Sequence, residues 1–309
     1  MELKVKDITK NFGDNEVLKG ISFSARAGEA FGLLGRNGAG KTTTMRIILG
    51  IFKSDSGIIE VDGMPFDDKN ISTGYMPEEK GLYPKVKIAD QLIYFAMLKG
   101  MNRSLAKTAV EKWLAKLDMS RYYSTKLMNL SKGNQQKIQL AAALLHEPDL
   151  IILDEPFSGL DPVNASVLEN IIKELISEGR TVIFSSHQMN YIESFCNEIA
   201  ILKGGKIVVD GGIPEIKRSY PRDRIVLSAG DKKAVGDHII SSMADLTVSA
   251  PIIKDGQMQI KLKDKDMKNE FFRRIAISDV DIDGIYVKEP SLTDIFVDHT
   301  EDKEGRVNQ

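Results

Sequence analysis

The fold of this chain is constrained most strongly by residues 35–43, a short glycine-rich stretch. These residues are Gly35, Arg36, Asn37, Gly38, Ala39, Gly40, Lys41, Thr42 and Thr43, and they fit the phosphate-loop pattern G-x-x-x-x-G-K-[ST]. The mostly apolar residues 30–34 before them are typical of a buried strand, and the apolar residues after them recur at helical spacing. A strand, a glycine loop and a helix in this order favour a nucleotide site over an ordinary glycine-rich turn.

The chemistry of this stretch follows from its residue types. The glycines let the backbone curl so that successive N–H groups point at one anion, and the positive end of the following helix adds to the attraction. Lys41 would reach the β- and γ-phosphates, and the Thr42 hydroxyl would ligate Mg²⁺. The stretch therefore predicts an α/β protein that binds a nucleoside triphosphate with magnesium.

Composition narrows the class of protein further. The 309 residues are enough for one large or two ordinary domains. With 42 Lys and Arg against 44 Asp and Glu, the net charge of −2 gives no electrostatic case for nucleic acid as the main partner. No run approaches 18 apolar residues, and the N-terminus lacks a signal-peptide core. We expect a cytosolic protein whose single cysteine, Cys196, is a small buried hydrophobe.

Periodicity divides the chain into an α/β part and a smaller C-terminal part. Strands are expected at 2–8, 17–25, 57–61, 73–76, 150–153, 181–185, 199–202 and 206–209, with helical spacing from about 86 to 146. Past a polar linker at 218–222, the expected order is strand 224–228, helix 232–243, strand 246–253, strand 257–263, helix 265–276 and strand 280–288. This β-α-β-β-α-β order is that of a ferredoxin-like domain, and a short helix at 291–298 and a charged tail at 301–309 follow.

An acidic pair follows the apolar strand at 150–153. Parallel strands deliver their carboxyl ends to one edge of a sheet, so Asp154 should lie at the same edge as the phosphate loop. An acid there can hold Mg²⁺, usually through water, and the adjacent Glu155 can polarise an attacking water. Phe12 precedes the turn at 13–15 and could stack on a purine, although on its own core packing is the favoured use of this ring.

At this point the chain resembles the ATP-binding subunits of ABC transporters, over residues 1 to about 217. Their second motif matches residues 150–156 (Leu-Ile-Ile-Leu-Asp-Glu-Pro), their D-loop matches 158–161 (Ser-Gly-Leu-Asp), and their switch histidine matches His187. Their signature motif, usually Leu-Ser-Gly-Gly-Gln, is here Leu-Ser-Lys-Gly-Asn at 130–134. The resemblance implies a P-loop NTPase of ABC ATPase type, with a RecA-like core and a helical subdomain at about 86–146. Residues 1–217 would form that domain, and 218–300 a small α+β domain.

The resemblance also implies roles for particular residues. Phe12 falls where the family places an aromatic that stacks on the base, and Val17 where a small apolar residue lies against the nucleoside. Residues 35–43 would bind ATP in cis, and Glu155 with His187 would act on the γ-phosphate. In a head-to-tail dimer that ATP binding joins and hydrolysis separates, the partner's ATP would meet Ser131, Lys132, Gly133 and Asn134.

Two residues depart from the family pattern. Glu78 takes the place of the Q-loop glutamine, and its carboxylate can still coordinate Mg²⁺ or accept a hydrogen bond from water. Lys132 replaces a signature glycine, and either adds a cation near the partner's γ-phosphate or is a solvated lysine on the first helical turn. Neither change affects Lys41, Asp154 or Glu155, so we expect an active ATPase with ATP and Mg²⁺ as ligands.

Details of the motifs are similar to one bacterial subgroup, which includes sodium-extrusion ATPases and related ABC-2-type exporters. The similarity lies in residues 77–84 (Pro-Glu-Glu-Lys-Gly-Leu-Tyr-Pro), the signature, and the ending at 289–296. Members carry a small C-terminal domain and act on a separate transmembrane permease, so we expect this chain at the cytoplasmic face of the membrane. The family docks the permease on the region matching 76–100, where Leu82 and Tyr83 are candidates for apolar contact, although packing within the helical subdomain would explain them as well.

A second class of function is a non-transport ABC ATPase that acts as a regulator or binding module on the ribosome or on DNA. Such members usually carry two ATPase halves in one chain or a long coiled-coil insertion. This chain has one set of motifs, and only 112 residues separate Lys41 from Asp154. The remaining histidines, at 146, 238 and 299, do not cluster with other ligand types, so no transition-metal site is expected.

Overall fold

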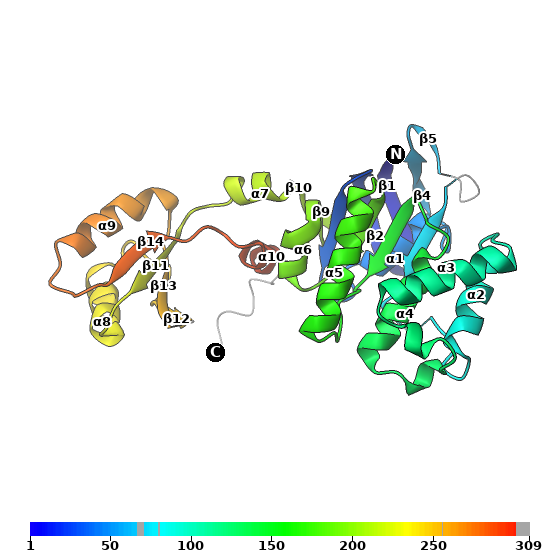
Figure 1. Ribbon diagram of the computed structural model, residues 1–309. Helices are drawn as coiled ribbons and strands as arrows, with labels where there is room; N and C mark the ends of the chain where they lie inside the picture. Colours follow the sequence, from blue (N-terminus) through cyan, green and yellow to red (C-terminus); the bar gives the residue numbers. More distant parts are fainter. Residues whose placement is uncertain (67–70, 80, 255, 301–309) are drawn as a thin grey trace. The chain divides into compact units, whose positions relative to one another are not determined.

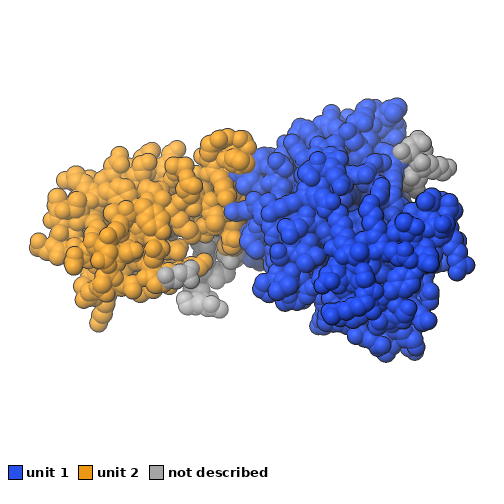
Figure 2. Space-filling view, in the orientation of Figure 1, with its two compact units in different colours: residues 1–213, 299–309 blue, residues 214–298 orange. Residues whose placement is uncertain are grey.

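The chain divides into two compact units in a computed structural model, which describes residues 1–66, 71–79, 81–254 and 256–300. One unit comprises residues 1–213 with 299 and 300, and the other comprises 214–298 (Figure 2). The division falls inside helix α7 (Ile213–Ser219), four residues before the expected boundary at 217. The expected charged tail at 301–309 lies outside the described residues.

A six-stranded sheet forms the centre of the first unit. Its order is β10-β9-β3-β8-β7-β6, and the strands are β3 (Ala30–Gly35), β6 (Thr73–Met76), β7 (Leu150–Asp154), β8 (Thr181–Ser185), β9 (Cys196–Lys203) and β10 (Lys206–Gly212). All neighbouring strands are parallel except β9 and β10, which form a hairpin. Every residue of β3, β7 and β8 is buried, as expected for strands covered on both faces. Burial also raises the pKa of the Cys196 thiol, which is the buried hydrophobe expected from the sequence.

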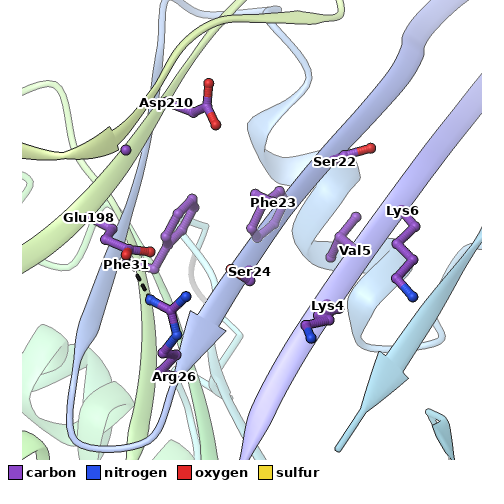
Figure 3. A pocket seen from close by; sticks show the side chains of 11 residues that line it. Lys4, Val5, Lys6, Ser22, Phe23, Ser24, Arg26, Phe31, Glu198 and Asp210 are labelled. Carbon is purple, nitrogen blue, oxygen red and sulfur yellow. Dashed lines mark hydrogen bonds and ion pairs between the residues drawn. The ribbon is translucent and has the colours of Figure 1, made fainter. Parts of the chain in front are cut away.

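A second, antiparallel sheet has the order β2-β1-β4-β5. Its strands are β1 (Glu2–Phe12), β2 (Asn15–Arg26), β4 (Ser56–Val61) and β5 (Met64–Pro65). The rings of Phe23 on β2 and Phe31 on β3 stack with 4.7 Å between their centroids. Beside them, Arg26 Nη1 donates a hydrogen bond to Glu198 Oε1 at 2.7 Å (Figure 3). These two contacts join the antiparallel sheet to the central sheet, below a surface hollow of about 420 Å³.

Helix α1 (Lys41–Ile48) lies within the hydrophobic core that the two sheets share. Its residues Met45 and Ile48 belong to one buried cluster with Leu33 of β3 and Val5 of β1. Figure 1 shows α5 (Pro162–Ser177) and α6 (Met189–Phe195) alongside the central sheet. The phosphate-loop helix is therefore anchored by apolar contacts on both sheets, and its N-terminus lies at the carboxyl end of β3.

The helical part of the first unit contains α2 (Ile88–Leu98), α3 (Arg103–Lys116), η1 (Ser120–Tyr122), η2 (Leu127–Asn129) and α4 (Lys132–Leu144), which lie together in Figure 1. Trp113 is buried, as predicted. The side chain of Asn102 caps α3 by accepting a hydrogen bond from Leu105 N, and that of Ser131 caps α4 by accepting one from Asn134 N. Each cap satisfies a backbone N–H that has no partner within the helix, which fixes where the helix begins. None of the helices in the described part of the chain has the length and hydropathy of a membrane span.

The second unit has the predicted ferredoxin-like topology. Its elements are β11 (Arg224–Ser228), α8 (Lys232–Ser242), β12 (Ile252–Lys254), β13 (Gln257–Lys261), η3 (Lys265–Met267), α9 (Lys268–Ala276) and β14 (Gly284–Val287). Helix α10 (Leu292–Thr300) follows, and the boundary between the units falls before its last two residues. The antiparallel sheet order is β12-β13-β11-β14, and apolar residues of α8 and α9 pack in one cluster with β11 and β13.

One strand of this unit differs from the prediction. The expected strand 246–253 is reduced to β12 at 252–254, because Leu246 packs in the core and residues 247–250 form a bridge and a bend. Pro251 lacks an N–H and interrupts any pairing that would extend β12 backwards. Residue 255 of the expected hairpin turn lies outside the described residues.

Candidate functional site

The phosphate loop connects β3 directly to α1. Its glycines Gly38 and Gly40 have φ values of +79° and +110°, a region that favours glycine. A Cβ on Gly40 would lie 2.6 Å from Leu18 Cδ2 and 3.3 Å from the Val17 carbonyl oxygen, so β2 backs onto the loop at this point. The loop is thus a tight turn that needs glycine for both its backbone conformation and its packing. The Val17 backbone lies against the loop, and contact of its side chain with a nucleoside stays a prediction.

The residues of the loop differ in their exposure to solvent. Arg36, Asn37 and Gly38 are exposed, Ala39 is buried, and Thr42 and Thr43 are half-buried. The Lys41 side chain is buried, and its Nζ donates to the Gly35 carbonyl oxygen at 2.8 Å. The ammonium is therefore folded back over the loop whose N–H groups and glycines would surround a phosphate.

Asp154 lies at the carboxyl end of β7, adjacent to the loop. Its carboxylate is buried, and each of its oxygens accepts from a hydroxyl: Oδ2 from Thr42 Oγ1 at 2.8 Å and Oδ1 from Ser185 Oγ at 2.6 Å. A hydroxyl oxygen and a carboxylate side by side are the ligand types that Mg²⁺ prefers, directly or through water. The residues present therefore fit the predicted magnesium ion.

Glu155 has an unusual backbone and a buried carboxylate. Its φ is +51°, in the left-handed region that is uncommon for a residue with a side chain. The backbone N–H donates to Ser185 Oγ at 3.0 Å, and Glu155 Oε2 lies 2.8 Å from His187 Nδ1 and accepts from His187 N at 3.3 Å. Burial raises the pKa of the Glu155 carboxyl, against the opposing effect of His187 and Lys41. The site thus holds a carboxylate with raised proton affinity at the edge where the loop lies.

Phe12 and Glu78 are placed at the surface. The Phe12 ring is 44% exposed, lies edge-on to Phe52 at 5.4 Å between centroids, and has the Lys10 ammonium 5.4 Å above it. Glu78 is exposed, and among the described residues no hydrogen bond joins it to Thr42 or Asp154. An exposed ring is free to stack on a base, whereas Glu78 is not part of the Asp154 cluster in this conformation.

The signature residues lie at the start of helix α4. Ser131, the N-cap of α4, and Lys132 are exposed, Asn134 is half-buried and Gly133 is buried. A Cβ on Gly133 would lie 2.8 Å from Asn164 Nδ2, so a larger residue here would require the Asn164 side chain to shift. No hydrogen bond in the described part of the chain joins these residues to the phosphate loop.

Two polar residues of the site were missed by the sequence analysis. Ser185 is the last residue of the predicted strand 181–185, and its fully buried hydroxyl is hydrogen-bonded to both acids. Gln139 is buried on α4, and its Nε2 donates to the Pro77 and Glu79 carbonyl oxygens at 2.6 and 3.0 Å, on either side of Glu78. The sequence signal for Ser185 was a serine at the end of an apolar strand, and the signal for Gln139 was a glutamine on the buried side of a helix.

Two family models match the chain. The model described as ABC transporter matches residues 18–158, and the model of the C-terminal domain of DrrA1-3-like ATP-binding proteins matches residues 211–300. The first match includes the phosphate loop, the signature residues and the acidic pair, and the second covers the ferredoxin-like unit.

Individual relatives extend these matches. The ABC transporter ATP-binding protein YhaQ of Bacillus subtilis is 40% identical over 298 residues, which is 96% of this chain and 97% of the relative. Nod factor export ATP-binding protein I of Burkholderia lata is 32% identical over 67% of this chain and 69% of its own length. A solved structure of an ATP-binding subunit of an ABC transporter is 31% identical, with a TM-score of 0.65 over 71% of this chain and 92% of that chain.

These relatives confirm the predicted fold class, a P-loop ABC ATPase with a small α+β domain. The high coverage of YhaQ shows that both units occur together in that relative as they do here. The chain therefore belongs to the ATP-binding proteins of ABC transporters: it is a nucleotide-binding ABC ATPase with a DrrA-like C-terminal domain.

Proposed function

We propose that this protein hydrolyses ATP to drive a separate transmembrane permease, as the ATPase subunit of an exporter. The observation that carries this proposal is the cluster at the carboxyl edge of the central sheet, where Asp154 and Glu155 lie beside Thr42 of the phosphate loop. The direction of transport is inferred from a relative whose name specifies Nod factor export.

The residues of the cluster suggest a division of labour in the cis site. The phosphate loop would hold ATP through its N–H groups and Lys41, with Val17 and the Phe12 ring against the nucleoside. Thr42 and Asp154 would hold Mg²⁺, with Glu78 as a further candidate ligand, and the bound ion would neutralise charge on the phosphates. Glu155 would accept the proton of the attacking water, because its pKa is raised by burial.

The second half of the ATP site would come from a partner subunit. Ser131 and Lys132 are exposed at the N-terminus of α4, a position that attracts anions. In a head-to-tail dimer, Ser131, Lys132, Gly133 and Asn134 would contact the γ-phosphate bound by the other subunit. Binding of ATP would then join two subunits and hydrolysis would release them.

The permease would dock on the helical part of the first unit, at the cytoplasmic face of the membrane. Of the two candidates for apolar contact, Leu82 is buried, which agrees with the alternative of packing within the helical part, so it is not proposed as a contact residue. Tyr83 is 54% exposed and stacks on Phe95 at 6.1 Å, and Tyr94 beside it is also exposed. An exposed aromatic group of this kind is suited to a protein interface.

Replacing Glu155 with Gln tests this proposal. The amide cannot accept the proton of water, so we expect ATPase turnover to fall by about a hundredfold or more while ATP binding persists. With ATP present, Glu155→Gln should accumulate as dimers in light scattering, and the wild-type protein should remain largely monomeric. Unchanged turnover would remove Glu155 from catalysis, and a monomeric ATP-bound variant would remove the half-site model.

A further experiment separates transport from action on ribosomes or DNA. The wild-type protein is purified in detergent from its native membranes and, in parallel, sedimented with ribosomes and with duplex DNA. Recovery of a stoichiometric membrane protein supports the permease model. Sedimentation with ribosomes or DNA, without a membrane partner, would favour the non-transport alternative.

A further inference from the structure

Ser185 connects the two acids of the site through one hydroxyl group. Its Oγ donates to Asp154 Oδ1 at 2.6 Å and accepts from the Glu155 backbone N–H at 3.0 Å. The side chain is completely buried at the end of β8, so water cannot take over either hydrogen bond. A single hydroxyl therefore fixes the orientation of the Asp154 carboxylate and the position of the peptide that carries Glu155.

The backbone of Glu155 needs such support. Its φ of +51° is costly for a residue with a side chain, and conformations of this kind persist only where the surrounding structure holds them. The Glu155 N–H also donates to the Ser185 carbonyl oxygen at 3.2 Å, but that bond alone does not involve the carboxylate of Asp154. The Ser185 hydroxyl connects the turn at Glu155 to Asp154, because it is hydrogen-bonded to both residues.

His187, two residues further along, holds the other end of Glu155. Its Nδ1 lies 2.8 Å from Glu155 Oε2, so the segment 185–187 contacts both the backbone and the carboxylate of the same residue. The loop after β8 thus determines where the carboxylate points. Displacement of a reacting group by about 1 Å can reduce a catalysed rate by about a hundredfold.

We propose that Ser185 is a positioning residue for ATP hydrolysis: its hydroxyl, which is held by Asp154, fixes the peptide of Glu155 and does not touch the nucleotide. This inference rests on the proposed function, because it requires Glu155 to act in hydrolysis. Under this proposal, Ser185 affects the rate of the chemical step and does not affect the affinity for ATP.

The same strand offers a matched control. Thr181 begins β8, is also completely buried, and its hydroxyl has no hydrogen-bond partner among the described residues. Ser185→Ala and Thr181→Val therefore each remove one buried hydroxyl from β8, but only the first removes hydrogen bonds to the acids. The pair separates the loss of these bonds from a general effect of changing the strand.

Steady-state ATPase kinetics, binding of a fluorescent ATP analogue and thermal melting should be measured for the full-length variants. We expect Ser185→Ala to lower kcat by about ten- to a hundredfold, with KM and analogue affinity changed by less than about threefold. Ser185→Thr keeps the hydroxyl and should recover most of the turnover, whereas Ser185→Cys, a weak donor, should not. Thr181→Val should retain wild-type kcat.

A double-mutant cycle tests whether Ser185 acts through Glu155. In single-turnover measurements, adding Ser185→Ala to Glu155→Gln should cause little further loss, because the group being positioned is already inactive. Additive losses, wild-type kcat in Ser185→Ala, or a loss confined to KM and analogue binding would each overturn the inference. If Glu155→Gln itself remains active, the proposed function fails first, so the two failures are distinguishable.

Discussion

At the scale of single residues, the adjacent acids Asp154 and Glu155 have different surroundings and hence different chemistry. Both oxygens of Asp154 accept hydrogen bonds from hydroxyls, which fix the orientation of this carboxylate beside Thr42. Glu155 is buried with one partner, His187, on its carboxylate, and burial raises its pKa. The different surroundings of the two neighbouring carboxylates suit the two roles proposed for them, metal binding for Asp154 and proton acceptance for Glu155.

The pH dependence of hydrolysis should reflect this environment. Since Glu155 must be deprotonated to act as a base and burial raises its pKa, kcat/KM should fall on the acidic side at a pH above the ordinary range of a glutamate. The contacts of His187 lower that pKa, so His187→Ala should move the acidic limb to higher pH. The limb is measured from residual ATPase activity across about pH 5 to 9.

His238→Ala is the matched control for this experiment, because His238 lies on α8 of the second unit. Its acidic limb should coincide with that of the wild-type protein. An acidic limb that stays in place or moves to lower pH in His187→Ala would contradict the assigned role of the Glu155–His187 contact.

At the scale of elements, α4 is the helix that links the site residues to one another. It begins at the signature residue Ser131, Gln136 Nε2 donates to the Pro156 carbonyl oxygen at 3.1 Å, and Gln139 holds the backbone on both sides of Glu78. One helix therefore contacts the residue after Glu155, the proposed catalytic acid, and the backbone on both sides of Glu78. Movement of α4 would shift both at once.

Replacing Gln139 tests the attachment of the 77–79 loop. Gln139→Leu removes the amide that donates hydrogen bonds to the Pro77 and Glu79 carbonyl oxygens. Because the 77–79 loop is partly exposed, water can donate to these carbonyls instead and compensate for part of the lost stability. We expect a loss of about 1 kcal/mol in the free energy of unfolding, measured by urea titration. Gln139→Glu, which presents a carboxylate to the same carbonyls, should be less stable than Gln139→Leu at neutral pH. The reverse order would contradict the donor role of Gln139.

At the scale of the whole molecule, the proposed head-to-tail dimer predicts that hydrolysis needs two chains, because the signature of one chain would complete the phosphate-loop site of the other. Lys41→Ala keeps an intact signature, and Ser131→Arg keeps an intact phosphate loop. Each variant alone should be inactive, whereas a mixture should regain ATPase activity, because one site of each mixed dimer combines the intact halves. ATPase rates of the separate and mixed proteins at equal total concentration measure this complementation.

The control for complementation is a mixture of Lys41→Ala with the double variant Lys41→Ala, Ser131→Arg, in which no complete site can form. This mixture should remain inactive. Activity of Ser131→Arg alone, or no recovery in the first mixture, would show that the chain does not use a partner's signature.

The sequence by itself determined those features that depend on local order along the chain. The glycine loop between an apolar strand and a helix, the acids at the end of the 150–153 strand and the β-α-β-β-α-β order of the second unit were all predictable, because each follows from residue type and spacing. The short β12 was not predicted, since Leu246 is apolar like a strand residue but packs into the core as part of a turn.

The tertiary structure decided the contacts between residues far apart in the chain. Ser185 meets Asp154 across 31 positions and Gln139 meets Pro77 across 62, so neither contact leaves a spacing pattern in the sequence. Leu82 and Tyr83 are neighbours in the sequence, but Leu82 is buried and Tyr83 is exposed. This difference in burial depends on how the segment packs in the folded protein, where Tyr83 stacks on Phe95. Sequence specified which chemical groups the site contains, because local patterns encode strands and loops; folding specified which groups support them, because hydrogen-bond partners depend on how strands and helices meet in space.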